Sequence, residues 1–231
     1  MATGSFTGND LIELVSTHYK HWLHDNFLST EQISEAVTQT GFITKKLCEI
    51  KLETGLQQGS YARINYNNGT FNPLYSVLQM KLKFNSDDSI FAFWGFKEDA
   101  TNPTFDMTES HAGFMINTEK NVKTMYSSTG NSDPLNPAQQ RIALSGIDPT
   151  NFNIYKIIHN QFWTRPLPIV QPYFGDIRLI RPTRAWGLAA TNSTITPMNE
   201  IHYVMLYIEN KTNAERYIEL KHITLGEEYA D

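Results

Sequence analysis

Cysteine, long apolar runs and clustered positive charge are all scarce in this sequence, and each scarcity excludes a class of protein. Cys48 is the only cysteine in 231 residues, so the chain cannot form an internal disulfide bond, and we interpret it as a small core residue. No window approaches the roughly 18 consecutive apolar residues of a transmembrane helix, so we expect no membrane span. The N-terminus lacks the basic start and continuous apolar stretch of a signal peptide, and we expect none in this chain.

Positive charge is neither abundant nor clustered. The 19 basic residues are outnumbered by 24 acidic residues, the formal net charge is −5, and the two signs are mixed along the chain. Nucleic-acid-binding surfaces need clustered Lys and Arg that displace counterions from phosphates, so we expect no nucleic acid partner. The remaining composition is that of a globular protein, since 40% of the residues are apolar and only 19% are charged.

The beginning of the chain has the pattern of an amphipathic helix. Apolar and aromatic residues recur at helical spacing, namely Leu11, Leu14, Val15, Tyr19 and Trp22. Asp10 and Glu13 stand three residues apart, as a helix N-cap and its N3 partner do. We therefore predict a helix over residues 9–24, within an N-terminal extension of residues 1–24. Its apolar stripe must pack on the protein's own sheets or on a neighbouring subunit. In the second case the helix would form the contact to copies of the protein or to other shell proteins.

After Ser29 the apolar residues alternate with polar ones, which predicts half-buried β-strands. The pattern is clear around Ile50 and Leu52 and from Leu78 to Phe84. Further strands are predicted at 60–65, 90–96, 111–116, 122–127, 140–144, 153–159, 169–174, 177–181, 203–209 and 217–225. Many short strands without intervening helical patterns indicate an all-β domain, residues 25–231, in which two antiparallel sheets pack face to face.

The order of several segments resembles a known family. These segments are Asp25-Asn26-Phe27, Gly59-Ser60-Tyr61-Ala62-Arg63, Pro73-Leu74-Tyr75-Ser76-Val77, Phe93-Trp94-Gly95-Phe96-Lys97, Gly146-Ile147-Asp148 with Phe152-Asn153-Ile154-Tyr155-Lys156-Ile157, and Ile218-Glu219-Leu220. In this order they resemble the concanavalin A-like lectin/glucanase jelly roll, over about residues 25–227. That fold occurs in legume lectins, in laminarinase-type glycosidases and in many viral and bacterial surface proteins. The resemblance implies a jelly-roll β-sandwich of two antiparallel sheets.

The residues that would carry hydrolysis in that family are missing. The laminarinase type needs two carboxylates on one face of a strand, in the pattern Glu-x-Asp-x-Glu, because side chains at i, i+2 and i+4 point the same way. The corresponding strand is Ser110-His111-Ala112-Gly113-Phe114-Met115-Ile116, and neither of its faces carries a carboxylate pair. We therefore expect that the protein is not an enzyme and has no catalytic residues. The alternative is a divergent glycoside hydrolase of the laminarinase-like class that uses an unfamiliar acid pair, for instance Asp106 with Glu109.

Two segments could hold a metal ion, although we predict none. His18, His21 and His24 recur every three residues, but such steps drift around a helix, so a third zinc ligand would be badly placed. The stretch 98–109 contains several oxygen ligands suited to calcium, and calcium remains an alternative there. The other histidines have no nucleophile at motif spacing.

Aromatic residues on strands and loops offer a way to bind carbohydrate. Sugars pack on exposed aromatic faces while carboxylates and amides bind their hydroxyl groups. The candidate carbohydrate-binding residues are Trp163, Trp186, Tyr126 and Asp106, with the tryptophans favoured because they lie near loops. We thus predict a non-catalytic structural or surface-interaction protein, a component of a virion or appendage on a virion or extracellular surface, which oligomerises and contacts cell-surface glycans.

Overall fold

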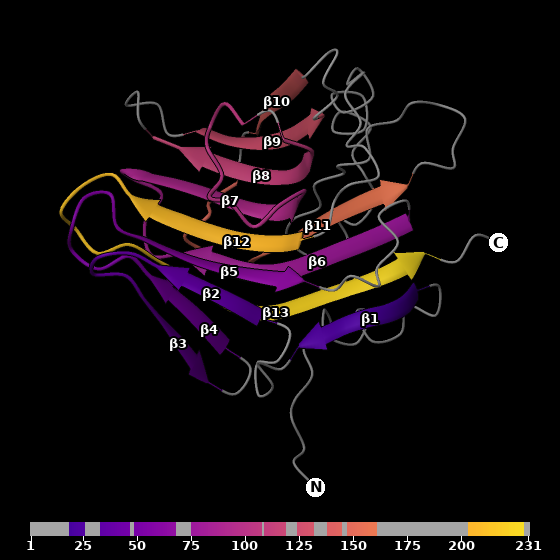
Figure 1. Ribbon diagram of the computed structural model, residues 1–231, viewed down its shortest axis with the longest axis horizontal. Helices are drawn as coiled ribbons and strands as arrows, with labels where there is room; N and C mark the ends of the chain where they lie inside the picture. The colour runs from indigo at the N-terminus through magenta and orange to yellow at the C-terminus, as the bar shows by residue number, and fades with distance from the viewer. Residues whose placement is uncertain are drawn as a thin grey trace, which may run out of the picture.

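Every regular element that the structure describes is a β-strand. The computed structural model describes residues 19–25, 33–46, 49–67, 75–107, 109–118, 124–131, 138–144, 147–160 and 203–228. The seven-stranded sheet has the order β10 (Ala138–Leu144), β9 (Thr124–Asn131), β8 (His111–Asn117), β7 (Ile90–Lys97), β12 (Tyr203–Asn210), β5 (Tyr61–Asn67) and β2 (Ile33–Val37), from top to bottom in Figure 1.

The second sheet has six strands. Five follow the order β11 (Asn153–Asn160), β6 (Tyr75–Phe84), β13 (Tyr217–Glu228), β4 (Glu49–Glu53) and β3 (Phe42–Lys46), and β1 (Tyr19–Asp25) also pairs with β13. All pairings in both sheets are antiparallel. The predicted all-β class with two antiparallel sheets is confirmed.

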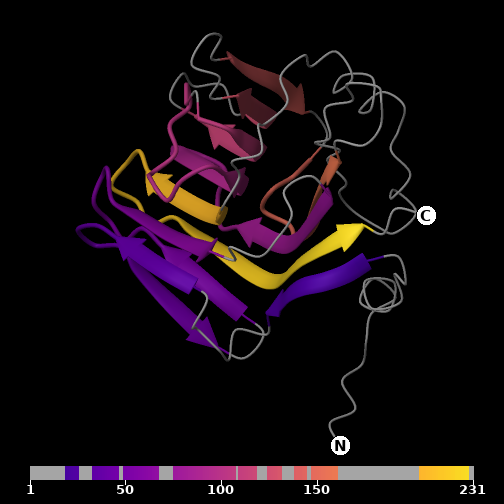
Figure 2. The same ribbon diagram turned by 45° about the vertical axis from the view of Figure 1, so that its right-hand side comes forward.

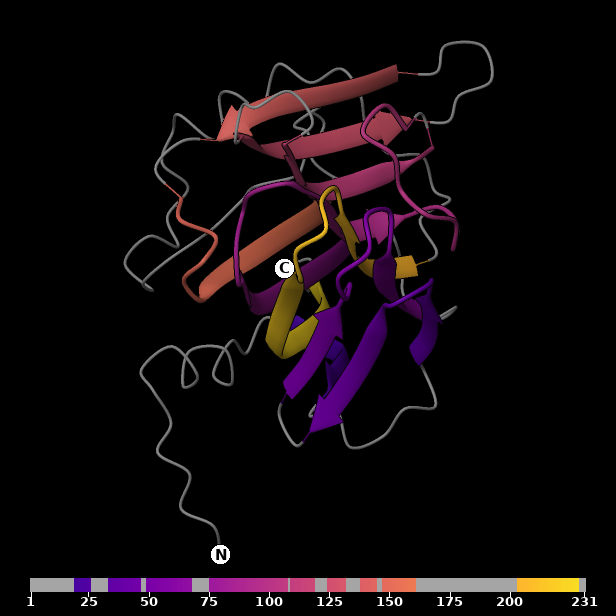
Figure 3. The same cartoon turned by 90° about the vertical axis from the view of Figure 1, so that its left-hand side faces the viewer.

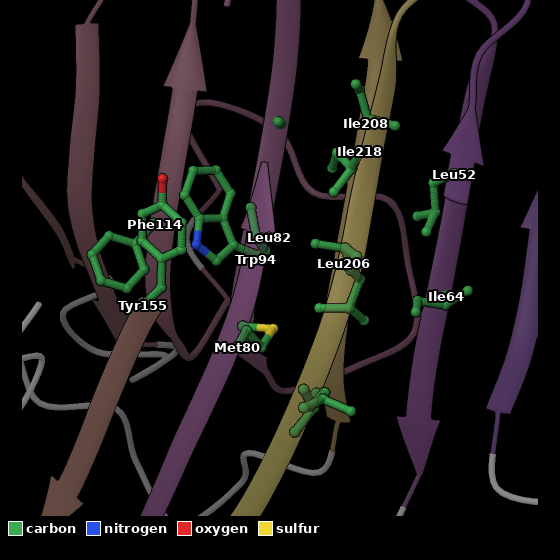
Figure 4. Packing of buried hydrophobic residues seen from close by; sticks show 14 of the residues in the cluster. Leu52, Ile64, Met80, Leu82, Trp94, Phe114, Tyr155, Leu206, Ile208 and Ile218 are labelled. Carbon is green, nitrogen blue, oxygen red and sulfur yellow. The ribbon is translucent and has the colours of Figure 1, made fainter. Parts of the chain in front are cut away.

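An aromatic group in the core joins the two sheets. Trp94 on β7 is the largest fully buried side chain among the described residues. Its ring stacks on Phe114 of β8, with centroids 5.6 Å apart, and meets the ring of Tyr155 nearly perpendicularly at 5.0 Å. Tyr155 belongs to β11 of the other sheet, and Figure 4 shows the three rings together. Each such ring pair contributes about 0.5–1.5 kcal/mol beyond the burial of apolar area.

The predicted N-terminal helix is wrong over residues 19–24. These residues belong to β1, which pairs with residues 223–228 of β13, and Figure 2 shows the two strands side by side. The physical reason is that β4 covers only residues 217–220 of the long strand β13. The rest of that edge gains a hydrogen-bonding partner from β1, which outweighs a weak local preference for helix. Residues 9–18 of the predicted helix lie outside the described residues.

Most other predicted strands are confirmed within a few residues of their ends. The predicted strands 169–174 and 177–181, and Cys48, lie outside the described residues. The pattern gave no separate prediction for β2 and β3, which are short and partly exposed. No helix in the described part of the chain is long and apolar enough to cross a membrane.

The strands β2 and β3 form the edges of the two sheets at the same end of the molecule, the lower end in Figures 1 and 3. Glu35 on β2 and Lys45 on β3 have the same alternation as core residues, and they form an ion pair across the two sheets. Inward-facing charges at an edge discourage pairing with other chains. This ion pair therefore places polar groups at the edge of the core between β2 and β3.

Asn210 lies at the end of β12 and is the first residue of a glycosylation sequon, but its side chain is fully buried. Its Nδ2 donates hydrogen bonds to the carbonyl oxygens of Gly55, at 3.2 Å, and Ala214, at 2.7 Å. Its Oδ1 accepts a hydrogen bond from the backbone N–H of Thr212 at 2.9 Å. A glycan on this amide nitrogen is therefore incompatible with the folded chain.

We expect Asn210→Asp to lower the free energy of unfolding by roughly 3 kcal/mol, because a carboxylate oxygen would then face two carbonyl oxygens in a buried place. Urea denaturation measures this change. The control is Asn213→Asp, which lies exposed in the next loop and keeps the oxygen that accepts from the Gln58 N–H. The control should change stability by less than about 0.5 kcal/mol. Equal effects of the two substitutions would contradict the structural role of Asn210.

Candidate functional site

The outer face of the seven-stranded sheet, which points away from the other sheet, is where the resemblance places catalytic acids. On β8 the core side carries Ala112, Phe114 and Ile116. The alternate residues on the outer side are histidine, glycine and methionine at positions 111, 113 and 115. The predicted division of this strand into two faces is confirmed, and its outer side carries no carboxylate.

Gly113 also leaves no room for a catalytic side chain at the centre of β8. A Cβ atom at this position would lie 2.6 Å from the carbonyl oxygen of Trp94 and 2.8 Å from the ring of Phe93. Real Cβ atoms essentially never approach other atoms so closely. The middle of the outer face is therefore packed, and an acid could enter it only if the neighbouring strand moved.

An apolar cluster covers this part of the outer face. It contains Phe91, Phe93, Met107, Met115, Met205 and Tyr207, all at most 2% exposed. Met107 comes from the loop of residues 98–110 between β7 and β8, whereas the others come from the strands. In Figure 1 this loop passes in front of β8 and β9. The 98–110 loop thus contributes its own side chain to the place where a ligand groove would need open space.

Polar contacts fix the first half of the 98–110 loop to the sheet. The buried Lys97 at the end of β7 forms an ion pair with Asp99 and donates a hydrogen bond to Thr101 Oγ1 at 3.0 Å. Burial opposes the ionisation of Asp99, but hydrogen bonds from Lys97 and Thr101 outweigh it and hold the pKa of Asp99 below its ordinary value. Arg63 on β5 donates to Asn102 Oδ1 at 2.5 Å.

His111 is fully buried where the same loop rejoins the sheet. Its Nδ1–H donates to the carbonyl oxygen of Glu109 at 2.7 Å, so its Nε2 accepts from the hydroxyl of Ser128 at 2.8 Å. Burial lowers the pKa of His111 to about 4, the Glu109 hydrogen bond opposes this shift, and the charges of Lys97 and Arg141 add to it. The imidazole is therefore neutral near pH 7. The sequence gave no sign of the Ser128 contact, because 17 residues separate the two side chains.

The second half of the loop meets β9 and β10 in a group of aromatic and charged side chains, which we call the Arg141 cluster. It consists of Phe105, Asp106, Tyr126, Gln139 and Arg141. The Arg141 guanidinium lies over the Phe105 ring, 3.8 Å from its centre, and its Nη1 donates to the Phe105 carbonyl oxygen at 3.1 Å and to Asp106 Oδ1 at 2.9 Å. Gln139 Nε2 donates to the same carbonyl at 3.0 Å, and the Tyr126 ring packs against Phe105 with centroids 5.6 Å apart.

Two of the four predicted carbohydrate-binding residues therefore lie in one cluster. Tyr126 is half-buried on the outer face of β9, and Asp106 stands at its rim with its side chain 82% exposed. Trp163 and Trp186 lie outside the described residues. Sequence reasoning missed Arg141, although the alternation of the predicted strand 140–144 places it opposite to Ile142 and Leu144, which are on the core side of the sheet.

No predicted metal site is assembled in the described part of the chain, where no group of three His, Cys, Asp or Glu could hold an ion. Several acids of the 98–110 loop already have partners: Asp99 binds Lys97, Asp106 binds Arg141, and Glu98 Oε2 accepts from the Ser110 N–H at 2.9 Å. Calcium in this loop stays the alternative to the prediction of no metal. Residues 21 and 24 lie in a strand, so the helical spacing of the histidine group does not hold there.

Solved structures share this arrangement of strands. The catalytic domain of an endo-1,3-β-glucanase (laminarinase) from Thermotoga petrophila RKU-1 has a TM-score of 0.57 and 12% identity, covering 92% of this chain and 99% of that chain. The carbohydrate recognition domain of Emp46p, in a metal-free form, gives 0.53 at 9% identity over 90% and 94%. The exoplasmic/lumenal domain of VIP36, bound to Ca²⁺ and Man3GlcNAc, gives 0.50 at 8% identity over 88% and 86%. No family model and no curated protein matches the sequence. At these identities the likeness shows a shared fold alone.

We expect stability to fall with acidification through His111. Its pKa is about 4 in the folded chain and about 6.5 in an unfolded chain. Between these pH values the unfolded state binds more protons, so the free energy of unfolding should decrease by up to roughly 3 kcal/mol as the pH falls from about 6.5 to about 4. Above that window this residue makes no pH-dependent contribution.

Urea denaturation at a series of pH values measures this effect, with His111→Gln as the comparison because glutamine does not titrate. The difference in unfolding free energy between wild type and variant should change through the window and stay constant above it. Parallel pH profiles of the two proteins would show that His111 is not the titrating group.

Proposed function

We propose that this protein, which has the concanavalin A-like jelly-roll fold, is a non-catalytic surface-interaction protein that binds carbohydrate at the Arg141 cluster. The fold is common to glycan-binding domains and to glucanases, so it makes carbohydrate the first class of ligand to consider. The choice between binding and hydrolysis depends on side chains, since fold alone does not determine function.

One observation carries the non-catalytic part of the proposal. The centre of β8 is occupied by Gly113 under the ring of Phe93, where even a Cβ atom has no space. A retaining glycosidase needs two carboxyl groups about 5–5.5 Å apart across the sugar linkage. The strand that would present them carries histidine, glycine and methionine on that face, and the histidine is buried with both ring nitrogens engaged.

The Arg141 cluster supports the binding part. Tyr126 and Phe105 are half-buried aromatic rings beside charged and amide side chains, which is the composition that sugar sites use. Among the described residues no hydrogen bond involves the Tyr126 hydroxyl, so this group can form a hydrogen bond with a ligand. The cluster lies at the β9–β10 side of the outer face, beyond the part that Met107 covers.

A divergent glycoside hydrolase is the second candidate, favoured by the likeness to laminarinases. Its acids would be Asp106 and Glu109. Asp106 is paired with Arg141, while Glu109 has one buried carboxylate oxygen with no hydrogen-bond partner among the described residues. Release of reducing sugars from β-glucans that is abolished in Asp106→Asn or Glu109→Gln would establish this candidate and overturn the non-catalytic proposal.

We expect a glycan array to identify bound carbohydrates and Tyr126→Ala to weaken that binding by about fivefold, because an aromatic contact of this kind contributes about 1 kcal/mol. The matched control is Tyr217→Ala on the other sheet, where Lys51 lies over the ring. The control should bind like the parent. Trp163→Ala and Trp186→Ala test the remaining predicted residues by the same measurement. Absence of glycan binding, or equal binding by all variants, would contradict the proposed function.

A location on a virion or extracellular surface, and assembly into oligomers, form part of the same proposal. Since β1 belongs to the sheet, residues 1–18 are the part of the predicted N-terminal extension that we propose for contacts to other subunits. We expect light scattering after size exclusion to show an oligomer that becomes smaller when residues 1–18 are deleted. An unchanged mass would remove this segment from the assembly.

A further inference from the structure

Arg141 is held in place by contacts that do not involve its charged partner. Its guanidinium stacks on the Phe105 ring and donates through Nη1 to the Phe105 carbonyl oxygen. Gln139 donates to the same carbonyl and so fixes the loop at that point. The arginine side chain is 29% exposed. Its position is therefore set by neighbouring groups before any ligand arrives, which reduces the entropy lost on binding.

The ion pair between Arg141 and Asp106 is easy to exchange. The Asp106 side chain is 82% exposed. A pair with such an exposed partner contributes at most about 1 kcal/mol to stability. No other contact of the Asp106 carboxylate is found among the described residues, so it can turn into solvent when another anion approaches.

Arg141 also has donors to spare. The described hydrogen bonds use Nη1 alone. The N–H groups of Nε and Nη2 have no partner among the described residues. A guanidinium with two nitrogens available along one edge matches the two oxygens of a carboxylate. The aromatic rings of Phe105 and Tyr126 lie directly beside it.

We propose that the carbohydrate recognised at the Arg141 cluster is an acidic sugar, whose carboxylate replaces Asp106 as the partner of Arg141 while its ring packs against Tyr126 and Phe105. This inference rests on the proposed function and narrows it to one class of ligand. A neutral sugar brings no negative charge to the guanidinium, so it leaves Arg141 paired with Asp106 and gains no ion pair.

The test compares sugars that differ only in their charge. Titration calorimetry with trigalacturonate and sialyllactose, each compared with its own methyl ester, gives the affinity for each member of a pair. In at least one pair the acidic member should bind about tenfold more tightly, as a hydrogen bond to a charged group predicts. The preference should shrink at high salt concentration.

Two substitutions assign the effect to the cluster. Arg141→Gln should remove the preference for the acidic member. Asp106→Asn should raise the affinity for the acidic member by about threefold, because it removes the competing carboxylate. The control is Arg216→Gln, which removes the same charge from the loop between β12 and β13 and should keep the preference.

The outcomes separate this inference from the function on which it rests. Equal binding of acidic and neutral members, or a preference that survives Arg141→Gln, would overturn the acidic ligand while carbohydrate binding stands. An increase in affinity in Asp106→Asn could not arise from a merely structural role of this pair. Absence of binding to every sugar on the array would overturn both.

Discussion

The packing of Trp94 between Phe114 and Tyr155 determines what the outer face of the seven-stranded sheet can present. Because side chains alternate along a strand, burying Trp94 and Phe114 fixes which residues of β7 and β8 point outward. A shift of one residue would move every outward side chain into the core. The face that holds Gly113 and Met115 is therefore as strongly determined as the core itself, although it points away from the other sheet.

The 98–110 loop contacts this face at two places. Its residue Met107 completes an apolar cluster and fills the space over β7 and β8. Its neighbours Phe105 and Asp106 turn toward β9 and β10 and form a half-open polar group with Arg141. A single loop thus closes the centre of the face and builds the Arg141 cluster at its side, which is why the candidate site lies away from the strand that carries the catalytic acids in laminarinase-type enzymes.

The regular alternation of apolar and polar residues predicts the fold from the sequence. In the strand from Leu78 to Phe84, for example, the inward residues are apolar and the outward residues are polar. The absence of acids on β8 was equally visible. The local pattern of residues 19–24 predicts a helix. Their observed pairing with β13 depends on residues about 200 positions away, and no local pattern contains that information. The Arg141 cluster was missed for a similar reason: Tyr126 and Asp106 were recognised singly, but their common neighbour Arg141 is brought to them only when the loop folds over β9 and β10.

The buried amide of Asn210 has a consequence for how the protein can be made. Eukaryotic secretory cells attach sugars to Asn-X-Thr sites while the chain is still being synthesised, before β12 and the following loop have closed around this side chain. A chain modified there could no longer bring its amide against Gly55 and Ala214. Such cells would yield a mixture in which only the unmodified chains reach the native state, whereas a bacterial cytoplasm avoids that loss.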